Sequence, residues 1–226
     1  MAVVLEDGSM LRTLENREGA VVMDADGAQI ARNEKCPGVH GEAVVGEVVV
    51  VGCEDGVLLF DDGEFTKVAS PDGYGRIGNQ AASDASRVLL GDYKTDPDAE
   101  LERPTQVSLV DTRSGELSLL DLETSYSFRS LGRGPEGEAL VLGTDGALKI
   151  IDPEKQKVVA SVPVVAKWEE PVEWQQPRPT LTVVGDLAWI SDPAAKRLHA
   201  VDLTSQEVVN TLEIDHAPNE LVGVTG

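Results

Sequence analysis

The sequence predicts an all-β protein, built as a β-propeller of four-stranded antiparallel blades. Short runs of β-branched and other apolar residues, bounded by Gly, Asp or Pro, recur along all 226 residues. This is the pattern of strands separated by tight turns. No stretch of a dozen residues keeps the apolar period of a helix. In addition, a unit of about 40 to 50 residues repeats, which is the period of propeller blades.

The repeat is marked by a step in which a strand of apolar residues ends in Asp. Because a short Asp side chain accepts hydrogen bonds from the backbone of the turn that follows it, we expect these residues to be structural. Successive steps lie 37, 50, 41 and 50 residues apart, and they are Met23-Asp24, Phe60-Asp61, Val110-Asp111, Ile151-Asp152 and Val201-Asp202.

The unit near the C-terminus is the best formed. Its predicted strands are Leu181–Val184, Leu187–Ile190, Leu198–Asp202 and Val208–Ile214. About five such units are visible. A small antiparallel sheet cannot bury both faces alone, so neighbouring units are expected to stack. Leu221–Val224 has the composition of the innermost strand of one more blade.

The length of the chain and its first residues indicate how many domains to expect. A chain of 226 residues suffices for one large all-β domain. The segment from Met1 to Gly8 resembles a strand that runs directly into a turn, and such an abrupt start suggests an N-terminal truncation. We therefore expect residues 1–226 to form a single β-propeller domain, or the C-terminal part of a larger propeller, with no separate second domain.

The charge balance limits the classes of partner. Lys and Arg number 19 against 40 Asp and Glu, which gives a net charge of −21. This charge repels phosphate backbones and anionic membrane surfaces, so nucleic acid is not expected as a partner. No run approaches the roughly 18 apolar residues of a membrane span. The first residues also lack a basic stretch followed by an apolar core. Neither membrane insertion nor an export signal is therefore predicted in this chain.

The two cysteines, Cys36 and Cys53, lie next to turn signals on either side of the strand-like segment Gly41–Gly52. Pairing of adjacent strands would bring them together. A disulfide is the favoured interpretation, worth about 2 to 4 kcal/mol, and it implies an oxidising compartment. Two reduced, buried thiols are the alternative. Zinc ligation by this pair is less favoured because the chain has no Cys-x-x-Cys spacing.

In a propeller, the connections into the innermost strands share one end of the central channel, so candidate ligands are sought there. Two of the three histidines, His40 and His216, fall in these connections, whereas His199 alternates within a strand and is expected to be structural or exposed. The predicted connections are Cys36–Glu42, Arg76–Gln80, Arg129–Glu138, Gln175–Pro179 and Asp215–Glu220.

Imidazole is a common zinc ligand, and a site assembled from several loops needs no local motif. His40 and His216 are therefore candidate zinc ligands. Asp215 and Glu42 could supply a further ligand or a partner that fixes an imidazole tautomer. Taken singly, each of these residues is more often an ordinary loop residue than a ligand.

Enzymatic signatures are missing: the sequence has no G-x-S-x-G elbow, P-loop, H-E-x-x-H helix or dinucleotide fingerprint. We therefore predict no catalytic residue and no enzyme. One alternative is a metal-dependent propeller hydrolase of the lactonase type, in which Asn79, Asn219 and Glu220 would serve as ligands. A non-catalytic interaction scaffold is another.

Several separated segments resemble the AztD-type zinc metallochaperones that accompany bacterial zinc ABC transporters. They occur in the same order along almost the whole chain. They are Cys36-Pro37-Gly38-Val39-His40-Gly41-Glu42-Ala43, Gly52-Cys53-Glu54-Asp55-Gly56-Val57, Arg76-Ile77-Gly78-Asn79-Gln80, Leu90-Gly91-Asp92-Tyr93-Lys94, Ser125–Pro135, Trp168-Glu169-Glu170-Pro171, Trp174–Pro179 and Pro218-Asn219-Glu220-Leu221.

The resemblance implies an exported, periplasmic or extracellular propeller that binds zinc and delivers it to the solute-binding protein of a zinc ABC transporter. It also implies that Cys36 and Cys53 are joined as a disulfide. Members of the family are longer at the N-terminus, with an export signal, further blades and further histidines. Of the positions expected near the metal, this chain has His40 and His216, with Asp215 a weaker candidate. Two histidines are an incomplete zinc site.

Overall fold

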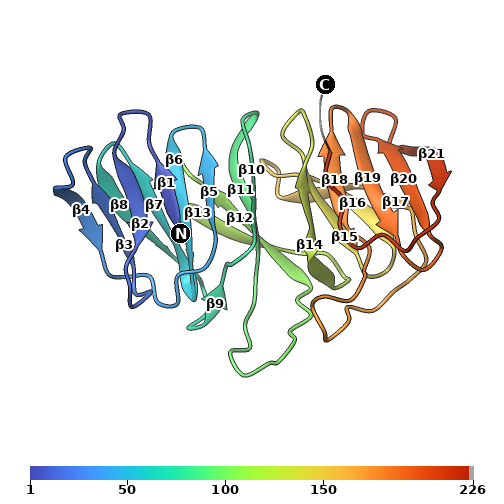
Figure 1. The fold of residues 1–226 in the computed structure, drawn as a ribbon, viewed down its shortest axis with the longest axis horizontal. Helices are drawn as coiled ribbons and strands as arrows, with labels where there is room; N and C mark the ends of the chain where they lie inside the picture. Colours follow the sequence, from blue (N-terminus) through green and yellow to red (C-terminus); the bar gives the residue numbers. More distant parts are fainter. Residues whose placement is uncertain (224–226) are drawn as a thin grey trace. The chain divides into compact units, whose positions relative to one another are not determined.

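The structure is a computed structural model, and it describes residues 1–223. These residues form 21 β-strands and no helix. The strands make five sheets, each built from four consecutive strands, and one sheet carries a short additional strand (Figure 1). The predicted fold class, an all-β protein of four-stranded antiparallel propeller blades, is confirmed. Within residues 1–223 there is no helix of the length and apolarity needed to cross a bilayer.

The chain divides into two compact units. The first comprises Met1–Asp98 and Ser108–Leu119, and the second comprises Ala99–Val107 and Leu120–Gly226. The division passes through β12 and β13 near their ends.

Three blades belong mainly to the first unit, and each follows the order of the sequence from its innermost to its outermost strand. The first blade contains β1 (Ala2–Val4), β2 (Met10–Thr13), β3 (Ala20–Met23) and β4 (Gln29–Asn33). The second contains β5 (Glu42–Val45), β6 (Val48–Cys53), β7 (Asp55–Asp61) and β8 (Glu64–Ala69), and β9 (Gly75–Arg76) pairs in parallel with β7. The third contains β10 (Gln80–Ser83), β11 (Ser86–Asp92), β12 (Gln106–Asp111) and β13 (Glu116–Asp121).

The second unit contains two blades. The fourth blade is formed by β14 (Tyr126–Arg133), β15 (Ala139–Gly143), β16 (Ala147–Asp152) and β17 (Lys157–Pro163). The fifth is formed by β18 (Leu181–Val184), β19 (Leu187–Asp192), β20 (Arg197–Asp202) and β21 (Glu207–Glu213).

The end of the chain differs from the expectation of one more strand at Leu221–Val224. Residues 221–223 form no strand, and Val224 lies outside the described residues. The segment still runs beside the innermost strand of the fifth blade, because the Thr182 hydroxyl donates to the Leu221 carbonyl at 2.8 Å.

The core of the first unit is organised by strands that are buried on both faces. Along β6, Val49 and Val51 belong to the apolar cluster shared with the first blade. Val50 belongs to the cluster shared with the third blade. Because successive side chains of a strand point to opposite faces, one continuous apolar run supplies both clusters. This explains why β6 is a run of valines rather than an alternating sequence.

The second unit has a core of its own between its two blades. Leu140, Leu142 and Leu148 of the fourth blade are fully buried and pack with Ala188 and Ile190 of the fifth. Each blade therefore buries a face that would be exposed in an isolated sheet.

Four of the five aspartates of the repeat step have the structural role predicted for them. Asp24, Asp111, Asp152 and Asp202 each accept a hydrogen bond from a backbone N–H two to four residues further on. In the outer turns of the last three blades, the residue four positions after the Asp has a positive φ, and it is Gly115, Gln156 or Gln206. Only Gly adopts this conformation without steric cost.

One predicted connection is wrong. The segment Arg129–Glu138 was expected to lead into an innermost strand, but Tyr126–Arg133 is itself the innermost strand β14. The connection into it is the preceding segment, 122–125. The reason is a bulge: the register of β14 against β15 shifts between Tyr126 and Leu131, so the polar residues between them break the alternation expected of a strand.

Candidate functional site

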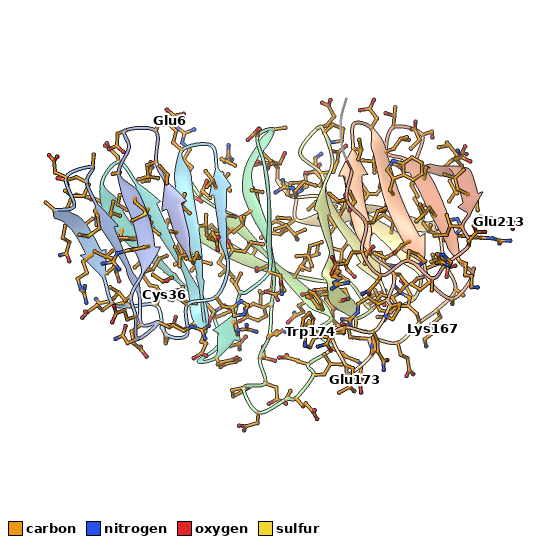
Figure 2. All side chains as sticks on the ribbon, viewed as in Figure 1. Glu6, Cys36, Lys167, Glu173, Trp174 and Glu213 are labelled. Atoms are coloured by element: carbon orange, nitrogen blue, oxygen red, sulfur yellow. A yellow bond between two sulfur atoms is a disulfide. The ribbon has the colours of Figure 1, made fainter. Side chains whose placement is uncertain are left out.

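The loop before β5 carries both a predicted zinc ligand and half of the predicted disulfide. Cys36 and Cys53 are joined, with their Cα atoms 4.9 Å apart, and both are fully buried. Figure 2 labels Cys36 at the base of the first two blades. The bond fastens the loop to the last residue of β6.

The other side of this loop is fastened to the first blade. The Arg17 guanidinium donates to the Val39 carbonyl at 2.8 Å, and the Val39 N–H donates to the Arg17 carbonyl at 2.9 Å. The backbone N–H of His40 donates to the Gly52 carbonyl at 3.0 Å. The position of His40 is therefore set by a covalent bond and by backbone hydrogen bonds from two blades.

The His40 residue is exposed, and its ring lies against Gly78. A Cβ added to Gly78 would lie 3.1 Å from His40 Nδ1 and 3.3 Å from Arg76 Cζ. Partial burial lowers the pKa of His40 below its usual value of 6.5, and the positive charge of Arg76 lowers that pKa further. A hydrogen bond with the Gly78 backbone and the charge of Asp92 oppose this shift. The imidazole is therefore neutral at neutral pH, as a metal ligand must be.

Asp92 holds the segment that packs against His40. Its carboxylate accepts hydrogen bonds from the Gly78 N–H at 2.6 Å, the Asn79 N–H at 3.0 Å and the Asn79 side-chain amide at 2.8 Å. Asp92 is only 1% exposed. Sequence reasoning missed this residue because its partners lie 13 and 14 positions away and follow no motif.

His216 and Asp215 follow β21, the outermost strand of the fifth blade, and both are exposed. The segment that contains them is anchored just beyond them. Arg129 of β14 donates to the Asn219 carbonyl at 2.8 Å and to Glu220 Oε1 at 2.6 Å. The neighbours of His216 in sequence, rather than His216 itself, therefore fix this segment to the fourth blade.

A buried ion pair lies close to this anchor. Glu170 and Arg178, both in the long loop before β18, form an ion pair, and their side chains are 3% and 1% exposed. The Glu170 carboxylate also accepts from the Ser127 hydroxyl at 3.0 Å. The guanidinium carbons of Arg178 and Arg129 lie 5.0 and 5.1 Å from the centroid of the Phe128 ring. These contacts join the long loop to the bulge in β14.

His199 is a structural residue. It is 8% exposed, and its Nδ1 lies 3.0 Å from the Thr211 hydroxyl of the adjacent strand. Its burial on β20 agrees with the expectation of a structural residue.

The predicted zinc ligands are distributed over both units. His40 belongs to the first unit, and His216 and Asp215 belong to the second. Across residues 1–223, no group of three or more His, Cys, Asp or Glu side chains is arranged to hold a metal ion. A shared zinc site of His40, His216 and Asp215 stays a prediction.

Comparison with known proteins finds a curated relative and solved structures of similar fold. No protein-family model matches the chain. The zinc chaperone AztD of Citrobacter koseri is 26% identical over an alignment of 215 residues, and the match covers 92% of this chain and 49% of the relative. The chain thus spans about half the length of this curated relative.

Two solved structures of Citrobacter koseri AztD, one of them the apo form, match the fold. The TM-scores are 0.81 and 0.80, both at 23% identity, with 97% of this chain covered and 61% and 60% of the solved chains. In sequence and in fold, the chain is similar over nearly its whole length to the zinc chaperone AztD of Citrobacter koseri.

Proposed function

We propose that this protein is a zinc carrier, in which His40 and His216 donate ring nitrogens to Zn²⁺ and Asp215 adds a carboxylate or orients an imidazole. The observation that carries the proposal is the 26% identity to a protein named zinc chaperone, maintained over 92% of the chain. The geometry of His40 supports it, because the imidazole is neutral, exposed and held by a fixed loop.

Two features of the His40 surroundings define what else the site needs. The positive charges of Arg17 and Arg76 disfavour a protonated His40, and they equally disfavour a bare dication beside it. Carboxylates must therefore share in binding. Two imidazoles fill only half of a tetrahedral shell, so the remaining positions belong to carboxylates, water or residues of a longer form. An incomplete protein shell also allows the ion to leave.

The proposed partner is the solute-binding protein of a zinc ABC transporter, to which the carrier passes its ion. The proposed location is periplasmic or extracellular. The Cys36–Cys53 disulfide supports this location, because such bonds persist in oxidising compartments. No enzymatic activity is proposed. A hydrolase with Asn79 and Asn219 as ligands is less well supported, since both side-chain amides already take part in structural hydrogen bonds.

Zinc titration by calorimetry near pH 7.5 tests the proposal, with calcium as the control ion. We expect zinc binding that weakens strongly near pH 5, because protonated imidazole cannot ligate. His40→Ala and His216→Ala should each weaken it by about tenfold or more. Glu213→Ala, whose side chain is 80% exposed two residues before Asp215, is the matched control for Asp215→Ala.

Zinc affinity that is unchanged at pH 5, or in both histidine variants, would refute the proposed ligands. Transfer is tested separately, by mixing the zinc-loaded protein with a zinc solute-binding protein and measuring which protein retains the ion after separation. Equal calcium and zinc affinity would instead indicate nonspecific cation binding by an acidic surface.

A further inference from the structure

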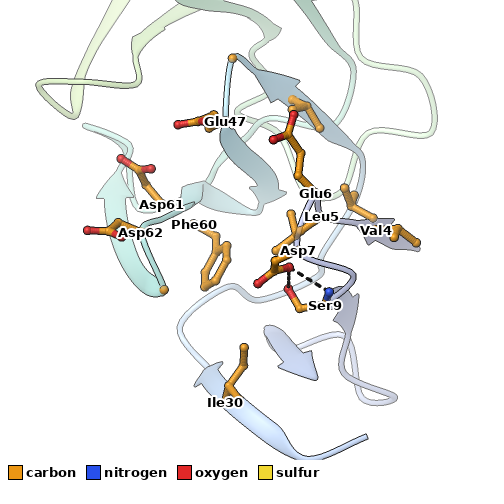
Figure 3. Close-up of a pocket in the computed structure, with 14 residues that line it drawn as sticks. Val4, Leu5, Glu6, Asp7, Ser9, Ile30, Glu47, Phe60, Asp61 and Asp62 are labelled. Atoms are coloured by element: carbon orange, nitrogen blue, oxygen red, sulfur yellow. Dashed lines mark hydrogen bonds between the residues drawn. The ribbon is translucent and has the colours of Figure 1, made fainter. Parts of the chain in front are cut away.

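A pocket lies between three hairpin turns at one end of the first two blades. It has a volume of about 530 Å³ and is formed by the β1–β2, β5–β6 and β7–β8 turns together with β1 and Ile30 of β4 (Figure 3). In a four-stranded antiparallel sheet these turns lie at the end opposite to the connection between blades. The pocket is therefore at the other end of the blades from His40, as the labels of Glu6 and Cys36 in Figure 2 show.

The floor of the pocket is apolar. Leu5 and Phe60 form its inner part and belong to, or pack against, the core between the two blades. Further out, Val4, Ile30 and Val44 are 73%, 54% and 44% exposed. Large aliphatic side chains that remain this exposed around one concavity are typical of a binding surface.

The rim of the pocket has a single sign of charge. Among the described residues that line it, five are carboxylates and none is Lys or Arg; the five are Glu6, Asp7, Glu47, Asp61 and Asp62. Hydrogen bonds from the Ser9 hydroxyl and N–H to Asp7 lower the pKa of that carboxyl. Carboxylates around low-dielectric walls concentrate the negative potential over the opening.

We propose that this pocket docks an extended segment of a partner protein, in which one or two large apolar side chains enter the floor and flanking Lys or Arg side chains meet the rim. The apolar floor selects the central side chains, and the rim selects the flanking charges. A second copy of this chain is the poorer occupant, because each copy carries a net charge of −21. The proposal does not depend on zinc, since the pocket and the His40 loop lie at opposite ends of the blades.

A direct test measures the fluorescence anisotropy of a labelled peptide, acetyl-Lys-Phe-Leu-Lys-Lys-amide, titrated with the full chain. Two comparison peptides replace either the three Lys by Glu or the Phe and Leu by Ser. We expect binding of the first peptide alone, and an affinity that falls several-fold between about 50 and about 500 mM NaCl.

Variants locate the binding. Ile30→Ser with Val44→Ser should reduce the affinity by about tenfold or more, and Glu47→Gln with Asp61→Asn should reduce it severalfold and flatten the salt dependence. The matched controls carry the same changes elsewhere on the surface. Val208→Ser with Val209→Ser, at residues that are 39% and 54% exposed, replaces the apolar pair, while Asp186→Asn with Glu207→Gln replaces the acidic pair. Thermal unfolding of every variant confirms that it is folded.

The proposal is overturned by equal binding of the Glu-substituted peptide, or by pocket variants that bind as the controls do. It is also overturned if sedimentation shows that the chain self-associates and that the Ile30 and Val44 changes abolish dimers, because the occupant is then a second copy. If a form extended at the N-terminus no longer binds the peptide because its added segment fills the pocket, the occupant is the chain's own segment. The proposal of a partner protein is then refuted. A failure of zinc binding leaves each of these results unaffected.

Discussion

The Glu170 carboxylate and the Arg178 guanidinium form an ion pair with almost no exposure to solvent, inside the long loop that precedes the fifth blade. Removing Arg178 takes away the cation that pairs with the buried Glu170 carboxylate. We expect Arg178→Leu to lower the free energy of unfolding by about 3 to 5 kcal/mol, as measured by urea denaturation. Lys155→Ala, which removes an ion pair whose lysine is 76% exposed, should have a far smaller effect. Similar losses in both variants would contradict the interpretation.

The disulfide is expected to stabilise the protein and to hold the His40 loop in place. The bond closes a loop with a sequence separation of 17, for which chain entropy gives about 3 kcal/mol. The paired change Cys36→Ser with Cys53→Ser should lower the free energy of unfolding by roughly that amount and should weaken zinc binding. Mass spectrometry after alkylation provides the check on the bond itself: labelled thiols in the unreduced protein would show that it does not form.

The ring of His40 should titrate below its usual pKa of 6.5 in the folded protein, because burial and Arg76 both disfavour the proton. The unfolded chain then binds a proton at a higher pH than the native state. This group therefore contributes stability above the unfolded pKa, and the contribution is lost as the pH falls from there through the folded pKa. NMR titration of the ring measures the shift directly. In Arg76→Gln the pKa of His40 should rise, and an unchanged value would exclude Arg76 as a cause.

At the alkaline end, Tyr93 should titrate late. Burial, together with the hydrogen bond of 2.6 Å from its hydroxyl to Asp72, raises the pKa of Tyr93 to about 12. Because the unfolded phenol ionises near pH 10, the stability from this group is present below that pH and is lost as the pH rises towards 12. Absorbance of the phenolate should show one late step in the folded protein that is missing in Tyr93→Phe. A wild-type curve that is complete by pH 11 would contradict the shift.

The blades could be predicted from sequence wherever the turn chemistry is local. Leu181–Val184 was predicted with the bounds of β18, because the turn residues Gly185 and Asp186 mark its end. The innermost strand β14 was misplaced because Ser127 and Ser130 are buried in it. There the Ser127 N–H donates to the Ser130 hydroxyl at 3.1 Å, and this bond replaces the apolar packing that the alternation rule assumes.

The residues around the candidate site also differ in whether a local sequence signal marks them. His40 and the cysteines could be found from residue type and the turns around them. Asp92 and the Glu170–Arg178 pair could not, because their roles depend on partners from other strands and loops. A buried carboxylate needs hydrogen-bond partners, but these can come from distant parts of the chain. No local sequence pattern therefore identifies it.

The valine run of β6 has a practical consequence for mutagenesis. Because Val49 and Val51 face one neighbouring blade and Val50 faces the other, adjacent positions in the chain report on different interfaces. Val51→Ala would weaken the packing against the first blade, in the cluster that contains the disulfide. Val50→Ala would weaken the packing against the third blade, which carries Asp92. The two faces of the second blade can therefore be perturbed separately, by substitutions at neighbouring positions of the same strand.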